Sequence, residues 1–127
     1  MTSDRDDRWV KTVTLVEPSL GDNTADADRL EAALKKALGA PIVHMDPELL
    51  KQLPDRLRNW RYRVAAVVFK DAGGAGILTH LAPADGTARL CGLAVDLGTT
   101  RVVLRLVDLA TGEPLDETVF DNPQAVV

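Results

Sequence analysis

Five consecutive residues, Asp96-Leu97-Gly98-Thr99-Thr100, combine groups that suit phosphate chemistry. The backbone amides of Gly98, Thr99 and Thr100 and the two threonine hydroxyls can face phosphate oxygens, and glycine lets a ligand approach the backbone closely. The Asp96 carboxylate can hold a water molecule of a magnesium shell. The stretch therefore predicts phosphate binding by Gly98, Thr99 and Thr100, with Asp96 as a metal residue acting through water. The alternative is an ordinary hairpin in which the aspartate and threonines only satisfy the turn.

Other residue types that carry out catalysis or bind metals stand alone. Cys91 is the only cysteine, so it can neither form an internal disulfide nor hold an iron–sulfur cluster by itself, and we expect it to be a small buried residue. His44 and His80 have no second histidine or cysteine at ligand spacing. No Ser/His/Asp pattern is present. The sequence thus predicts no metal site built from protein side chains alone.

Composition and charge narrow the class of protein. The chain has 127 residues, of which 46% are hydrophobic and 27% charged, as expected for one ordinary globular domain or two very small ones. A net charge of -4 argues against a nucleic-acid partner. No run is long enough to span a membrane, and the polar start lacks the apolar core of a signal peptide. We therefore expect a cytoplasmic protein without a membrane or nucleic-acid partner.

A local basic cluster is the one feature that favours nucleic acid. It joins arginines to two aromatic residues that could stack on bases: Arg56, Arg58, Trp60, Arg61, Tyr62 and Arg63. We favour a simpler interpretation, in which the arginines solvate a helix end and pair with nearby acids while the aromatic rings pack inward.

The predicted turn lies between two strands. Residues 92–96 and 101–108 are rich in aliphatic and β-branched side chains, and a second turn at residues 110–113 leads into a third strand. The almost uninterrupted apolar character of the first strand predicts that the turn lies at the edge of a buried sheet.

The preceding part of the chain predicts a small βαβαββ module. Residues 1–9 form a charged leader, and the module runs from residue 10 to residue 86. We expect strands at residues 10–17 and 42–45, a helix that ends at Gly39, a second helix split by Pro54, and a hairpin of residues 63–70 and 76–82. The predicted core joins the leucines of the helices to apolar strand residues, namely Leu30, Leu34, Leu38, Leu53, Leu57, Val13, Leu15, Val67 and Phe69.

The turn and its flanking strands resemble the first phosphate hairpin of the superfamily that includes actin, sugar kinases and heat-shock chaperones. More narrowly, GLAVDLGTT, VVLRLVDLATGEPL and the later Asn122-Pro123-Gln124 resemble the ATP-dependent reductive activators of corrinoid proteins. Upstream, VEPSLGDNTADADRLEAAL and LLKQLPDRLR follow a similar order and spacing in that family. The resemblance implies an α/β protein in which a linker module precedes the start, at residues 87–127, of an actin-like (ribonuclease H-like) ATPase domain.

The function that the resemblance implies is restoration of inactivated Co(II) corrinoid to Co(I), with ATP and Mg²⁺ as cofactors and a corrinoid protein or methyltransferase as partner. The chain departs from the family in three ways. It lacks the N-terminal [2Fe–2S] domain, and it stops before the second phosphate loop and the adenosine site. Arg101 also stands where members of the family often have a small residue with a hydroxyl group. We therefore expect a truncated piece or split subunit that is inactive alone. We also expect its open strand edge to self-associate, to pair with a complementary chain or to be covered by the linker module. The alternatives are a piece of another actin-like kinase and a non-enzymatic docking module.

Overall fold

The computed structural model describes residues 9–125. The chain divides into two compact units, Met1–Ala88 and Arg89–Val127. The division lies two residues beyond the predicted boundary. Of the predicted charged leader, residues 1–8 lie outside the described residues. Trp9 is part of the first unit, because its carbonyl accepts a hydrogen bond from the Val68 amide and its ring lies 6.0 Å from that of Phe69. No helix within residues 9–125 is long and apolar enough to cross a membrane.

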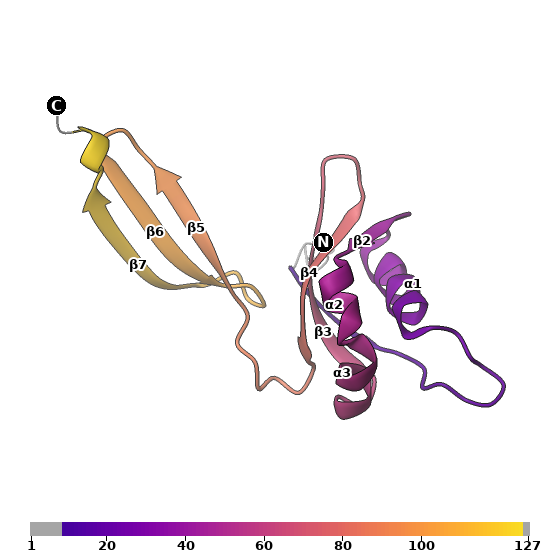
Figure 1. Ribbon diagram of the computed structural model, residues 1–127. Coiled ribbons are helices and arrows are strands. Elements are labelled where there is room, and N and C mark those ends of the chain that lie inside the picture. The colour runs from indigo at the N-terminus through magenta and orange to yellow at the C-terminus, as the bar shows by residue number, and fades with distance from the viewer. Residues whose placement is uncertain (1–8, 126–127) are drawn as a thin grey trace, which may run out of the picture. The chain divides into compact units, whose positions relative to one another are not determined.

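Within residues 9–88, the first unit consists of a four-stranded sheet and three α-helices (Figure 1). Its elements in chain order are β1 (Val10–Thr14), α1 (Asp26–Leu38), β2 (Val43–Met45), α2 (Pro47–Lys51), α3 (Leu53–Asn59), β3 (Arg63–Lys70) and β4 (Gly76–Pro83). The strand order is β1-β3-β4-β2, in which β2 pairs parallel with β4 and the other pairs are antiparallel. The predicted α/β class and βαβαββ element order are confirmed, although β1 ends three residues earlier than predicted.

Local signals in the sequence account for the helix ends. Gly39 follows α1 in the left-handed conformation, at φ 61°, and its amide donates to the Lys35 carbonyl. The Asp46 side chain accepts a hydrogen bond from the Glu48 amide at the start of α2. The two short helices separate at Gln52, so Pro54 lies in the first turn of α3, where a missing amide proton costs little.

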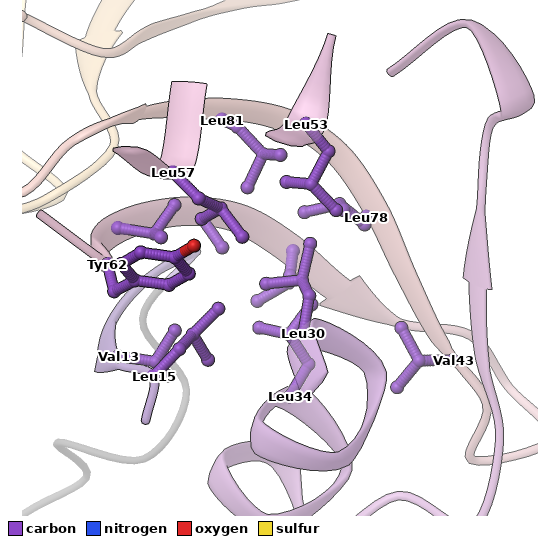
Figure 2. Close-up of a cluster of buried hydrophobic side chains, with 13 residues drawn as sticks. Val13, Leu15, Leu30, Leu34, Val43, Leu53, Leu57, Tyr62, Leu78 and Leu81 are labelled. Carbon is purple, nitrogen blue, oxygen red and sulfur yellow. The ribbon is translucent and has the colours of Figure 1, made fainter. Parts of the chain in front are cut away.

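The core of the first unit lies where α1 and α3 pack on the sheet (Figure 2). Leu30, Leu34, Leu53 and Leu57 are at most 1% exposed, as predicted. From the strands the cluster contains Val13, Val43, Val64, Ala66, Val68, Leu78 and Leu81, and from positions next to β1 and β3 it contains Leu15 and Tyr62.

The predicted contribution of Val67 and Phe69 to this core was wrong. Val67 is buried and Phe69 half-buried, but neither belongs to the cluster, which takes Val64, Ala66 and Val68 from β3. Successive side chains of a strand point to opposite faces. Because β3 is apolar at six consecutive positions, residues 64–69, its sequence does not show which alternate set meets the helices.

The second unit is a three-stranded antiparallel sheet in the order β5-β6-β7. It consists of β5 (Cys91–Leu97), β6 (Arg101–Asp108), β7 (Pro114–Asp121) and a short 3-10 helix, η2 (Pro123–Ala125). These strands confirm the predicted hairpin and third strand. Two expectations were wrong, because Cys91 is exposed and because β5 is exposed along most of its length rather than buried. Within residues 89–125 no element covers this sheet, so an apolar strand sequence did not translate into burial.

Candidate functional site

The predicted phosphate-binding residues form the tight end of the β5–β6 hairpin. Leu97 pairs with Val102, and the Gly98 amide donates to the Arg101 carbonyl at 2.9 Å, which places Thr99 and Thr100 at the tip. Both threonines are exposed, and within residues 9–125 their amides donate no hydrogen bond. The tip therefore presents two backbone donors and two hydroxyls to a ligand.

Gly98 is required by the turn itself. A Cβ at this position would lie 2.6 Å from the Arg101 carbonyl oxygen, closer than real Cβ contacts come. Its amide is already used within the hairpin, so the donors that remain for a phosphate are those of Thr99 and Thr100. The glycine allows the strands to approach each other, and no left-handed backbone is involved.

Asp96 lies one residue before the end of β5, opposite Val103 of β6, and is exposed. Asp96 lines a shallow hollow of about 250 Å³ together with Ala94, Val95, Val103, Arg105 and Glu117. The Arg105 guanidinium donates to Glu117 from Nε at 2.8 Å, and its Nη2 lies 2.7 Å from the same oxygen. The Asp96 carboxylate itself forms no ion pair among residues 9–125.

Arg101 introduces a positive charge at the same end of the sheet. It is paired with Asp121 in the register but forms no ion pair with it within the described residues. Because alternate residues of a strand share a face, Arg101 and Val103 lie on the face that carries Asp96. The turn thus combines one carboxylate and one guanidinium at its base with two hydroxyls at its tip.

Asn122 belongs to the site, although the sequence analysis gave it no role. Its side-chain Nδ2 donates to the Gly98 carbonyl at 2.9 Å, and its backbone amide donates to the Thr100 carbonyl at 2.8 Å. Its Oδ1 accepts from the Gln124 amide at 3.0 Å, at the start of η2. The signal available in the sequence was an asparagine followed by proline directly after a strand, a pattern typical of side-chain capping in turns.

Neither the described histidines nor the cysteine adds a metal centre. Within residues 9–125, no three histidine, cysteine or acidic side chains come close enough to hold a metal ion. Asp96 by itself suits a magnesium ion that takes its other ligands from water and phosphate. The hairpin end can therefore offer a ligand two backbone amides, two hydroxyls and one carboxylate.

The basic cluster of the first unit agrees with the simpler interpretation. Arg56 donates to Gln52 at 2.6 Å and lies 5.8 Å from the centre of the Trp60 ring, while Arg58 pairs with Asp55 at 3.6 Å. The Tyr62 ring is buried in the core and cannot stack on a base.

Comparisons with known proteins agree across both units. The family model described as the RACo linker region matches residues 9–88, and the one described as the RACo middle region matches residues 91–127. A solved structure described as "Reductive activator for corrinoid,iron-sulfur protein" is 34% identical, with a TM-score of 0.73. That match covers 98% of this chain and 20% of the other, so the chain spans about a fifth of the length of that protein. A search of curated proteins finds no significant match. The chain therefore belongs to the RACo family of reductive activators, in which it corresponds to the linker region and the middle region that follows it.

Proposed function

We propose that the chain is part of an ATP-dependent reductive activator that returns inactivated Co(II) corrinoid proteins to Co(I). The observation that carries the proposal is the 34% identity to a reductive activator for a corrinoid, iron-sulfur protein, sustained over 98% of the chain. The partner would be a corrinoid protein or its methyltransferase, and the working compartment the cytoplasm.

The hairpin end is proposed to form the first phosphate contact of the ATP site. Thr99 and Thr100 would direct their amides and hydroxyls at the β- and γ-phosphates, where oriented donors stabilise developing charge. Asp96 would hold a water molecule of the magnesium shell, and Gly98 would keep the backbone close to the phosphates. ATP, when bound, supplies the free energy for an electron transfer that is otherwise unfavourable.

This arrangement supports binding rather than complete catalysis. At the turn, the described residues provide two backbone amides, two hydroxyls and one carboxylate, which make one side of a nucleotide site. We therefore propose that hydrolysis requires a complementary ATPase segment, and that the first unit serves as the linker module.

The test uses ATP affinity, measured with and without magnesium, in an assembly of the chain with its complementary ATPase segment. Asp96→Asn should weaken the magnesium-dependent affinity about 10- to 100-fold, the usual effect of losing a residue that supports a metal shell. Glu113→Gln is the matched control, because Glu113 is also an exposed carboxylate of this sheet but lies in the opposite turn.

Three outcomes separate the candidate functions. Magnesium-dependent affinity that falls in Asp96→Asn but not in Glu113→Gln supports the ATP site. An equal magnesium dependence in all three proteins removes Asp96 from the site. An assembly that binds a corrinoid protein but no nucleotide would instead favour a docking module, for which the exposed apolar residues Leu93, Val95 and Leu97 provide a surface.

A further inference from the structure

Asn122 connects the end of β7, the β5–β6 turn and η2 through its side chain and its backbone amide. The residue directly follows β7, yet its hydrogen bonds reach Gly98 and Thr100, more than twenty positions earlier in the sequence. Figure 1 shows η2, which begins at the next residue, beside the closed end of the β5–β6 hairpin. Without these hydrogen bonds, only the pairing of β5 with β6 would hold the turn in place.

The two hydrogen bonds fix the carbonyl that precedes Thr99 and the carbonyl of Thr100, at the two ends of the Thr99-Thr100 pair. Nδ2 of Asn122 holds the Gly98 carbonyl at 2.9 Å, and its backbone amide holds the Thr100 carbonyl at 2.8 Å. A peptide unit is planar, so fixing the Gly98 carbonyl also fixes the direction of the Thr99 amide proton. Asn122 thereby determines where one of the two free amide donors of the tip points.

The carboxamide oxygen of Asn122 also forms a hydrogen bond. Oδ1 accepts from the Gln124 amide at 3.0 Å, so the side chain cannot rotate about its terminal bond without breaking both contacts. Asparagine is suited to this position because it offers a donor and an acceptor on a short side chain. Aspartate would keep the acceptor but lose the donor to Gly98, and serine would be too short to reach both.

We propose that Asn122 is a positioning residue for polyphosphate binding, which it promotes by orienting the Thr99 amide through the Gly98 carbonyl. This inference rests on the proposed ATP site and extends it to a residue that would not itself touch the nucleotide. The loss of one neutral hydrogen bond predicts an ATP affinity about three- to tenfold lower in Asn122→Ser. Adenosine lacks phosphates, so its affinity should stay unchanged.

The experiment compares ATP and adenosine affinities in the assembly with the complementary ATPase segment. Asn122→Ser removes the Gly98 contact while a hydroxyl remains to cap η2, and Asn122→Ala removes both side-chain contacts without adding a charge. Gln124→Ala is the matched control, because only the backbone of Gln124 is used in the described contacts. Amide hydrogen exchange of Val103 and Leu104 in the 127-residue chain shows whether β6 stays folded in each variant.

The proposal predicts a selective effect. Both Asn122 variants should lose ATP affinity and keep adenosine affinity with slow β6 exchange, whereas Gln124→Ala should match the wild type. Equal losses for ATP and adenosine would overturn the proposal, as would wild-type ATP affinity in Asn122→Ser. A wild-type assembly that binds no ATP would overturn the proposed function as well, which distinguishes that failure from a failure of Asn122 alone.

Discussion

At the scale of single residues, the hairpin end combines structural and chemical requirements that a sequence motif does not separate. Gly98 is required by the short distance between its backbone and the Arg101 carbonyl, whereas the hydroxyls and amides of Thr99 and Thr100 donate no hydrogen bond among residues 9–125. A substitution of Gly98 therefore tests the hairpin, and only substitutions of its neighbours test phosphate binding without disturbing the backbone.

Gly98→Ala should destabilise the second unit by about 1–3 kcal/mol, the range for overpacking at a site that cannot relax, because the new methyl group would meet backbone 2.6 Å away. Hydrogen exchange of the β6 amides measures the loss. Gly92→Ala, in the strand that leads to this turn, is the matched control, since its Cβ would meet only the flexible end of the Leu109 side chain at 2.9 Å. Equal effects of the two substitutions would show that the turn tolerates a side chain at Gly98.

At the scale of elements, the first unit is held by the leucine face of α1 and by an arginine at the start of that helix. Arg29 is only 8% exposed and donates to the Thr24, Val16 and Asp22 carbonyls and to the Asp22 carboxylate. These contacts tie the segment between β1 and α1 to the helix, so a single buried cation orders a connection that has no regular structure of its own.

Leu34→Ala should lower the free energy of unfolding by about 2–5 kcal/mol, because Leu34 is fully buried and its truncation leaves a cavity beneath α1. Chemical denaturation followed by the fluorescence of Trp60, which packs against this core, measures the change. Leu20→Ala is the control, since Leu20 is fully exposed and its loss should cost less than about 0.5 kcal/mol. A loss that small for Leu34 would mean that α1 does not pack as described.

Asp22 should make the stability of the first unit depend on pH in the acid range. The hydrogen bonds from Arg29 and then Thr24 hold the pKa of the Asp22 carboxyl well below its ordinary value. A group whose pKa is lowered by folding stabilises the folded state above its unfolded pKa, about 3.9, and this contribution disappears as the pH falls further. Denaturation curves between pH 6 and pH 2 should therefore show a decline that is weaker in Asp22→Asn. Asp55→Asn, at an exposed ion pair, should leave the decline unchanged.

At the scale of the whole molecule, the two units differ in how they bury apolar surface. The first unit encloses a core between helices and sheet, whereas the second is a sheet with no covering element within residues 89–125. One face of that sheet carries exposed apolar side chains of β5 and neighbouring strands: Leu93 at 62%, Val95 at 57%, Leu97 at 75%, Leu106 at 38% and Phe120 at 44%. Strand β5 is also a sheet edge, and unpaired edges recruit further strands.

The isolated chain should therefore self-associate or pair with a complementary chain. Light scattering of the 127-residue chain should report a mass above that of a monomer, and Val95→Lys should reduce it. Ala94→Lys places the same charge on the opposite face of the strand and should have a smaller effect if the apolar face makes the contact. A monodisperse monomer whose Ala94 and Val95 amides exchange rapidly would contradict this expectation.

The sequence by itself determined the features that depend on local spacing. The leucine period of α1, the left-handed Gly39 and the strand–turn–strand pattern around Gly98 act over a few residues, so they can be recognised without the fold. Three features depended on contacts between distant segments and were decided by the tertiary structure. The face of β3 that meets the helices follows from strand register, the exposure of Cys91 and β5 follows from what covers a sheet, and the role of Asn122 follows from the return of β7 to the β5–β6 turn. The first two follow from which side of a strand another segment covers, and the third from which turn the residue after β7 reaches, so none can be read from local spacing.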